Sequence, residues 1–532
     1  MNKKKSEKEL IEHNKRLSKE NEELKKKLGF VKEKLKIQSD KLENWQTETN
    51  FKELKEYKRK YELLLQERQC EKAKHTKEIE SLEVSIKNLT DRLNKDSSNS
   101  SIPSSAEKIY TKKKCVNTSR EKTGRKTGGQ IGHKGSGLTK EKAEEMIKSG
   151  KEEHVIEEHV LEGTDINERE SIVKYEIDIE TKTRVIEHRF YVKETAKEIP
   201  VEYNTDVQYG VGLKTFAAVA LNEGFISLNR TTKIIDEMTN NTIKLSEGSL
   251  VNFNRELAMK TMKSINRIKK ALIKAGILNV DETGVRVNVD ETGVGVNGEL
   301  NCLHTAVTKY YTYYQIENKR GKDGISNLGI LEYYVGILVH DHFSSYYQYK
   351  TMTHAECNAH ILRYLNQVIE VFEREGAKKF LEFLIKTNTN KRDLQAKNIH
   401  EFKKEEIEKL ETEYLQLLKE WEKEYKAYTK GKTKTQCLID EGNLFERLRE
   451  YREEHLLFIK NFKVPFSNNL AERSLRLIKT KMKVSGCYRG EDNGGNFTTI
   501  RSLFETVKKQ ELNLFESIRK VFNKEDLEFV KA

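Results

Sequence analysis

Two short stretches decide the fold expected of the central part of this chain: ILNVDETG (residues 277–284) and ILVHDHFSSYY (residues 337–347). Each begins with an apolar run that favours a buried strand, and the runs lead to Asp281 in the first stretch and Asp341 in the second. From about residue 276 the pattern predicts three strands in succession, then a helical stretch, then the strand that leads to Asp341. We therefore predict an α/β fold in which a mixed sheet holds both aspartates at strand ends.

A third acid, Glu472, lies much further along the chain, in PFSNNLAERSLR (465–476), on a predicted helix. Carboxylate oxygens are the ligands that Mg²⁺ prefers, and two such ions about 4 Å apart can activate a nucleophile and stabilise the leaving oxygen of a phosphoryl transfer. Two carboxylates on rigid strand ends and a third on a helix packed across the sheet would provide such a site. Asp281, Asp341 and Glu472 are therefore the candidate catalytic and metal-binding residues.

The chain has 532 residues, enough for several domains, and 34% of them are charged, with a net charge of +13. A basic excess favours a polyanionic partner, although many soluble proteins carry one. The placement of the charge is more telling, since nine Lys or Arg residues and a single acid lie between Lys108 and Lys134. This stretch ends in the glycine-rich GRKTGGQIGHKGSG (124–137), whose backbone can approach phosphates closely. We interpret it as a DNA-binding arm, with a flexible solvated linker as the alternative. Its candidate DNA-binding residues are Arg125, Lys126 and Lys134.

The six cysteines are scattered and form no C-x-x-C pair, which argues against a disulfide framework or a zinc ribbon and suits a reducing cytoplasm. The first residues, MNKKKSEKEL, lack an apolar signal core, and no stretch approaches the roughly 20 apolar residues of a membrane span. We therefore expect a cytoplasmic protein with no membrane partner.

Residues 1 to about 95 contain no proline and a single glycine, and their apolar residues recur at coiled-coil intervals. Leu10, Leu17 and Leu24 are seven apart, and the same spacing resumes after a four-residue shift. We predict a coiled coil that mediates oligomerisation, with a long, charged solitary helix as the alternative.

Changes in composition and pattern divide the rest of the chain. Alternation in SIVKYEIDIE (171–180) and TRVIEHRFYVKE (183–194) predicts strands. A helix, a break at Asn240 and Asn241, and a second helix are reminiscent of a helix-turn-helix, although any helical hairpin gives the same pattern. The predicted parts are a coiled-coil segment (1–95), a Ser/Asn-rich and then basic, Gly-rich DNA-binding linker (96–150), a small β-rich module (151–205), a helical, helix-turn-helix-like DNA-binding region (206–275), the first part of a catalytic core (276–364), a helical insertion (365–455) and the second part of the core with C-terminal helices (456–532).

Several motifs occur in a fixed order along nearly the whole chain. After the leading coiled coil come SSNSSIPSS, GGQIGHKG, VQYGVGLK, DETG, HDHFSSYY, HAECNAH and NNLAERSLR. In this succession the chain resembles transposases of the IS66 family of bacterial insertion sequences. The resemblance implies a DDE-type, RNase H-like core, which agrees with the order of the predicted strands, and cleavage and joining of DNA ends with two Mg²⁺ ions, for which Mn²⁺ can substitute.

Matched motif by motif, Asp281 or its repeat, Asp341 and Glu472 fall on the family's three acids. The resemblance also implies double-stranded DNA as the partner, a homo-oligomer formed through the coiled coil, accessory proteins of the same element, and a location at the bacterial nucleoid. Two rival readings stay open: an RNase H-like nuclease that cuts without strand transfer, and a catalytically inactive DNA-binding relative.

Zinc is the first point at which the chain departs from similar proteins. They often carry a small cysteine zinc-binding module before VQYG, whereas residues 151–205 contain no cysteine. Histidines and acids would have to replace the thiolates, which is a poor ligand set, so we predict no zinc there. In HAECNAH (354–360) a thiolate and imidazoles at three-residue spacing would suit zinc. Such residues more often pack beneath a strand or face substrate, and we predict no zinc at this motif either.

A tandem repeat is the second departure, since VDETGVRVN (280–288) is followed at once by VDETGVGVN (289–297). Only one of the two aspartates, Asp281 or Asp290, can take the active position. Asp281 keeps the apolar lead-in ILNV, whereas Asp290 keeps a short approach through Asn-Gly, a good hairpin turn. We favour Asp281 and retain Asp290 as the alternate.

Three cations follow Glu472 on its predicted helix: Arg473, Arg476 and Lys479. They are candidate phosphate contacts. The alternative is a solvated helix surface on which Glu472 pairs with Arg476 four positions later.

Overall fold

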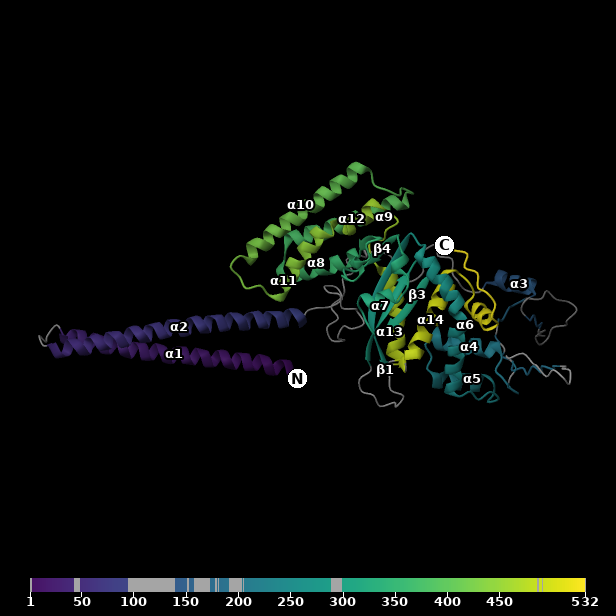
Figure 1. Ribbon diagram of the computed structural model, residues 1–532, viewed down its shortest axis with the longest axis horizontal. Helices are drawn as coiled ribbons and strands as arrows, with labels where there is room; N and C mark the ends of the chain where they lie inside the picture. Colours follow the sequence, from purple (N-terminus) through teal and green to yellow (C-terminus); the bar gives the residue numbers. More distant parts are fainter. Residues whose placement is uncertain are drawn as a thin grey trace, which may run out of the picture. The chain divides into compact units, whose positions relative to one another are not determined.

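The structure is a computed structural model, and it describes residues 2–42, 48–93, 139–150, 153–156, 173–177, 179, 181–190, 203, 205–288, 299–485, 488–489 and 491–531 (Figure 1). The chain forms two compact units, one of residues 1–116 and 358–462 and the other of residues 117–357 and 463–532. Four of the residues singled out from the sequence lie outside the described residues: Arg125, Lys126, Lys134 and Asp290.

A six-stranded mixed sheet organises the second unit. The strands are β1 (Ile277–Asn288), β2 (Glu299–Val307), β3 (Thr312–Glu317), β4 (Ile337–His340), β5 (Thr353–Glu356) and the short β6 (Tyr488–Arg489). Their order is β3-β2-β1-β4-β5, with β6 paired to the far end of β1. The first three strands form an antiparallel meander, and β4 pairs in parallel with both β1 and β5. The predicted succession of three strands, a helical stretch and a further strand therefore agrees with the structure.

The two faces of β1 pack against different helices, because successive side chains of a strand point to opposite sides. Leu278 and Val280 are buried in a cluster with apolar residues of α6 (Glu247–Ile273). Val285 is buried on the other face, in a cluster with Leu475 and Ile478 of α13 (Asn469–Ser485). Helix α13 therefore covers the face toward which the odd-numbered residues of β1 point.

A further helix, α14 (Glu491–Lys509), lies along the edge strand β3 and also packs against α6. The hydroxyl of Ser502 accepts a hydrogen bond from the backbone N–H of Tyr314 at 2.9 Å, and the hydroxyl of Thr506 accepts one from Thr312 at 3.1 Å. Backbone groups that an edge strand would otherwise leave unpaired are thus satisfied by side chains.

Helices α4 (Val211–Asn222), α5 (Leu228–Met238) and the first half of α6 share a separate apolar cluster. Asn240 and Asn241, between α5 and α6, both adopt positive φ, 49° and 61°, a region that asparagine tolerates better than most residues. The Ser246 hydroxyl then caps α6 by accepting from the N–H of Ser249. The helix, break and second helix predicted here are present; a DNA-binding role for them stays a prediction. Other helical elements among the described residues of this unit are α3 (Lys140–Ser149), α7 (Lys322–Ser326), α15 (Leu514–Phe522) and the 3-10 turns η5 (Leu331–Tyr333) and η6 (Tyr346–Gln348).

The alternating stretches between residues 151 and 205 form no strand in the part of that segment that the structure describes. Val185 is 95% exposed, so its side chain is not buried against an apolar surface. The prediction of strands is therefore wrong for the described residues, because alternation stabilises a strand only when one face is buried.

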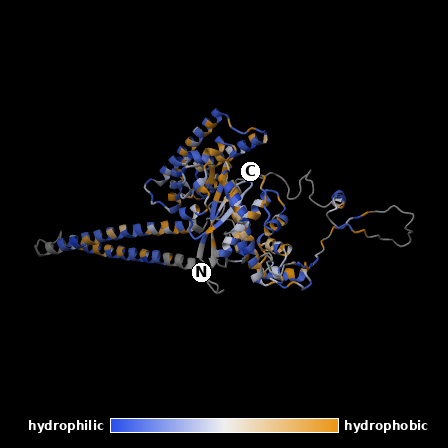
Figure 2. Cartoon of the chain, turned by 45° about the vertical axis from the view of Figure 1, so that its right-hand side comes forward, coloured by the Kyte–Doolittle hydropathy of each residue, from blue (hydrophilic) through white to orange (hydrophobic). Residues whose placement is uncertain are grey.

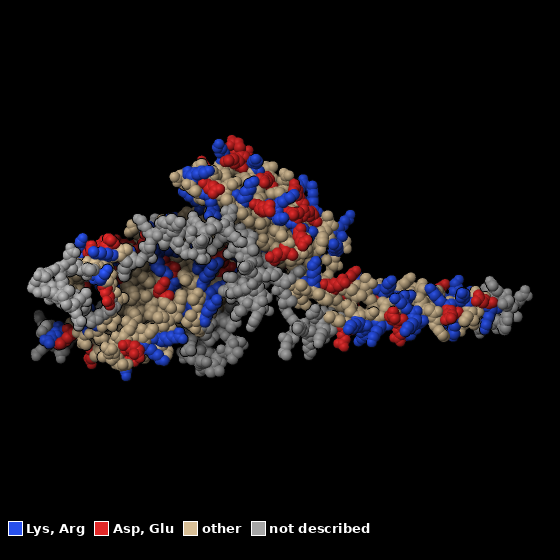
Figure 3. Space-filling view, turned by 180° about the vertical axis from the view of Figure 1, so that it is seen from behind, with Lys and Arg blue, Asp and Glu red and all other residues tan. Residues whose placement is uncertain are grey.

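In the other unit, α1 (Asn2–Leu42) and α2 (Glu48–Leu93) pack against each other as an antiparallel hairpin. His13 lies 2.7 Å from Glu78 at one end, and the Lys34 ammonium lies over the Tyr57 ring nearer the other. The apolar spacing is thus used within the chain, and oligomerisation through this segment stays a prediction. Hydrophilic residues predominate along both helices (Figure 2), and charges of both signs are interspersed on the face of the hairpin seen in Figure 3.

The helical insertion also belongs to this unit and begins slightly earlier than predicted, at Asn358. The buried Arg374 and Glu441 form an ion pair at 3.1 Å, and the Trp421 indole donates to the same carboxylate at 2.9 Å. The helices of the insertion are α8 (Asn358–Phe372), α9 (Glu375–Ala396), α10 (Lys404–Thr429), α11 (Gln436–Glu450) and α12 (Arg452–Lys460).

No helix among the described residues is long and apolar enough to cross a membrane.

Candidate active site

Parallel pairing of β1 and β4 brings the first two acids together. The ladder pairs Ile277 with Ile337 and Asn279 with Val339, and continuing the same register places Asp281 beside Asp341, directly after β4 ends. Both aspartates therefore belong to the odd-numbered set of positions that faces α13.

The charge environment of Asp281 shows that the third acid is close as well. Burial raises the pKa of Asp281 well above its usual value, and the charges of Glu282, Asp341 and Glu472 raise it further. Its Oδ1 atom accepts a hydrogen bond from the backbone N–H of Glu282 at 2.9 Å, which opposes the increase. A cluster of carboxylates that repel one another is a suitable set of hard oxygen ligands for divalent cations, because such ions remove the repulsion.

Glu472 stands in the first turn of α13, with its side chain 14% exposed. The Arg476 guanidinium lies 3.8 Å from its carboxylate, the i,i+4 ion pair that the sequence offered as an alternative to a phosphate contact. Burial lowers the pKa of Lys479 and the negative charge of Asp281 opposes that decrease, so Lys479 is near the first acid. Arg473, one position after Glu472, is exposed on a different side of the helix.

Asn468, immediately before α13, anchors the start of this helix to the sheet. Its side-chain amide donates to the backbone oxygen of Val280 at 2.7 Å and its Oδ1 accepts from the Asn279 amide at 2.9 Å, next to Asp281 on β1. Its backbone N–H donates to the Cys357 sulfur at 3.1 Å, and its backbone oxygen accepts from the N–H of Glu472 at 3.2 Å. Sequence reasoning missed this residue, although an asparagine just before a predicted helix was a signal of a helix start.

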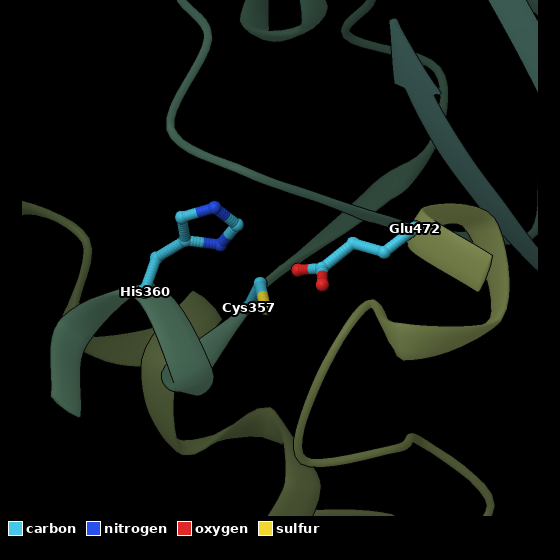
Figure 4. A group of neighbouring side chains, drawn as sticks. All are labelled: Cys357, His360 and Glu472. Carbon is cyan, nitrogen blue, oxygen red and sulfur yellow. The ribbon is translucent and has the colours of Figure 1, made fainter. Parts of the chain in front are cut away.

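The thiol of Cys357, at the end of β5, lies near the third acid. Its sulfur and a Glu472 carboxylate oxygen are within 4.8 Å of each other. Figure 4 shows the two side chains as neighbours. His354, from the same HAECNAH motif, bonds to His340 at 3.0 Å through one ring nitrogen and to the backbone oxygen of Tyr349 at 2.9 Å through the other. His354 therefore packs within the fold, which is the more common arrangement for such residues.

The stretch that follows β4 is held by buried carboxylates on both neighbouring strands. Tyr346 donates to Glu282 of β1 at 2.6 Å, and Tyr347 donates to Glu356 of β5. His342 also bonds to Glu356. Burial lowers the pKa of His340, the last residue of β4, to about 4, so this imidazole is neutral near pH 7. Sequence reasoning did not single out Glu282 or Glu356.

Comparison with known proteins gives one match. A family model described as "Transposase IS66 family" matches residues 206–496, more than half of the chain and a span that includes Asp281, Asp341 and Glu472. No curated protein and no solved structure matches the chain.

Proposed function

Because the chain belongs to the IS66 family of transposases, we propose that it cuts double-stranded DNA at the ends of an insertion sequence and joins the freed 3′-OH to target DNA in a Mg²⁺-dependent reaction. The single observation that carries this proposal is the convergence of Asp281, Asp341 and Glu472 on one face of the sheet, where their charges raise the pKa of Asp281.

We propose that the sheet unit is an RNase H-like core. The support is its strand order, β3-β2-β1-β4-β5, with an antiparallel meander followed by two parallel strands. In this arrangement the first and second acids come from the adjacent central strands β1 and β4. A helix that the chain reaches only after the insertion then supplies the third.

In the proposed reaction Asp281, Asp341 and Glu472 would hold the divalent ions. Two bound ions would activate the nucleophile and stabilise the leaving oxygen. Water would first attack phosphorus in line and break the bond to the 3′ oxygen at the element end, which leaves as the free 3′-OH. That 3′-OH would then attack a target phosphodiester in line, and the 3′ oxygen of the cut target strand would leave. Lys479 and Arg476 lie on the Glu472 side of α13, where they can neutralise phosphate charge near the acids.

We assign the first acid to Asp281 rather than Asp290. In β1 the lead-in to Asp281 places Leu278, fully buried, in the apolar cluster shared with α6. If the second repeat took the same place, Arg286 and Val287 would occupy the positions of Ile277 and Leu278. Asn288 would take the position of Asn279 with no change of side chain. The two copies therefore differ in the apolar residues that precede the aspartate.

The other proposed partners rest on sequence. The basic arm with Arg125, Lys126 and Lys134 would contact DNA backbone, and the α1–α2 hairpin would pair two copies of the chain so that two DNA ends are held together. Accessory proteins of the same element are a further proposed partner.

The test is cleavage and strand transfer on a labelled insertion-sequence end. Asp341→Asn and Glu472→Gln should each lower the cleavage rate roughly 100-fold or more, since each removes a metal ligand worth several kcal/mol of transition-state stabilisation. Asp323→Asn, which alters an exposed acid of the same unit paired with Lys319, is the matched control and should cleave normally.

Products decide among the readings. Strand-transfer products together with loss in both variants support a transposase. Cleavage without strand transfer would point to a nuclease. DNA binding without cleavage by the wild-type chain would indicate an inactive relative.

A further inference from the structure

Glu282, the residue after Asp281, points to the opposite face of β1 and is almost completely buried. Its side chain is 1% exposed. One carboxylate oxygen accepts from the Tyr346 hydroxyl at 2.6 Å, and the other accepts from Nη2 and Nε of Arg320 at 2.9 and 3.2 Å. A buried carboxylate of this kind is tolerated because both oxygens are paired.

Tyr346 and Arg320 also connect Glu282 to the second acid, Asp341. Tyr346 begins η6, five positions after Asp341, and the Arg320 guanidinium lies over the ring of Phe343, 4.7 Å from its centroid. The backbone N–H of Phe343 in turn donates to Oδ1 of Asp341 at 3.1 Å. A continuous set of contacts therefore joins the backbone of β1 beside Asp281 to the side chain of Asp341.

A hydrogen bond from a tyrosine to a buried carboxylate also holds the other side of this segment. Tyr347 donates to Glu356 on β5, as Tyr346 does to Glu282 on β1. The segment that follows Asp341 is therefore hydrogen-bonded to both strands that flank β4. Of these two flanking strands, only β1, which carries Glu282, also carries an acid of the candidate active site, Asp281.

We propose that Glu282, Tyr346 and Arg320 are positioning residues that fix the spacing between the carboxylates of Asp281 and Asp341, and thereby set the affinity of this pair for divalent cations. The inference rests on the proposed function, because it takes both aspartates as metal ligands. None of the three residues touches substrate in this account. Their effect passes through the backbone of β1 and through the turn after β4.

The first test removes one hydroxyl. Tyr346→Phe keeps the ring in its packing but deletes the bond to Glu282. The matched control is Tyr334→Phe, since Tyr334 is also fully buried and donates to the backbone oxygen of Ile337 at 2.9 Å, at the opposite end of β4. Both variants should lose a similar amount of thermal stability.

The two variants should differ in metal binding. Titration of the full chain with Mn²⁺, followed by electron paramagnetic resonance, should show about 10-fold weaker binding for Tyr346→Phe and wild-type binding for Tyr334→Phe, as expected when a group that orients a metal ligand is lost. The Mn²⁺ concentration that gives half-maximal DNA cleavage should rise by the same factor. Glu282→Gln, which keeps the shape but removes the charge, should weaken Mn²⁺ binding in the same direction.

Two outcomes separate the failures. If Asp341→Asn binds Mn²⁺ as the wild type does, the proposed metal site is wrong and the inference falls with it. If Asp341→Asn loses binding while Tyr346→Phe and Glu282→Gln bind like Tyr334→Phe, the proposed function stands and the positioning role is overturned.

Discussion

The two faces of β1 treat neighbouring carboxylates in opposite ways. Asp281 faces α13, where its nearest charged neighbours include two further acids and its pKa is raised. Glu282 faces the other side, where an arginine and a tyrosine pair with both of its oxygens. One face therefore gathers acids whose mutual repulsion raises the pKa of Asp281, even with Arg476 and Lys479 beside them, and the other face neutralises Glu282. The proposed divalent cations would relieve the repulsion on the α13 face.

The largest expected effect comes from removing the charge on the α13 face. Asp281→Asn should lower DNA cleavage at least about 100-fold, because a proposed metal ligand is lost. The free energy of unfolding should stay the same or rise, since repulsion among the acids is relieved. Asp290→Asn is the control and should keep its activity; loss of activity in that variant alone would transfer the first acid to the second repeat.

A smaller effect should follow from removing the contacts by which Asn468 holds the start of α13 against β1. Asn468→Ala leaves the Val280 oxygen and the Asn279 amide without their partner and should lower the free energy of unfolding by about 2–3 kcal/mol, as well as reducing cleavage by displacing Glu472. Denaturant unfolding and the cleavage assay measure the two effects. In Asn513→Ala, a cap at the start of α15 is lost, and we expect a cost of about 1 kcal/mol with cleavage intact.

The pH dependence of stability should report the repulsion directly. The folded state holds the Asp281 proton more tightly than the unfolded state does. This carboxyl therefore does not lower the free energy of unfolding at pH values below roughly 4, its pKa in the unfolded chain. It becomes destabilising as the pH rises through the raised folded pKa. The difference in unfolding free energy between Asp281→Asn and wild type should therefore grow with pH and shrink when Mg²⁺ is added. A constant difference from pH 4 to 8 would contradict the assigned repulsion.

The smallest effects concern the cations of α13. Arg476→Ala and Lys479→Ala should each weaken DNA binding several-fold and reduce the salt dependence by about one unit of log–log slope, as for a lost phosphate contact. Arg473→Ala, about 100° around the same helix from Glu472 and farther still from Lys479, should change both less. Equal losses in the three variants, measured by fluorescence anisotropy over a salt series, would show that position on the helix does not matter.

Local pattern was enough to predict the strands that carry Asp281 and Asp341 and the helix that carries Glu472, because each apolar run is continuous in sequence. Their approach to one another could be expected from the order of the strands. Which face each acid occupies depends on the pairing register of β1 with β4, which no local pattern specifies.

Other features depend on partners that lie far away in the chain. Asn468 is 188 positions from Val280, whose backbone oxygen it binds, and nothing beside either residue indicates the other. Alternation in residues 173–190 looked as favourable as that of a true strand, yet Val185 has no surface to pack on. The heptad leucines predicted helix association, but α1 and α2 associate within one chain, and the spacing alone does not distinguish this from association between chains.

The hydroxyls that α14 presents to β3 also limit how copies of this molecule can associate. With the outward N–H groups of Thr312 and Tyr314 already bonded to Thr506 and Ser502, an incoming strand would have to displace a whole helix before it could extend the sheet. Aggregation by edge-to-edge pairing at β3 is therefore disfavoured, and the proposed assembly of copies on DNA would use other surfaces.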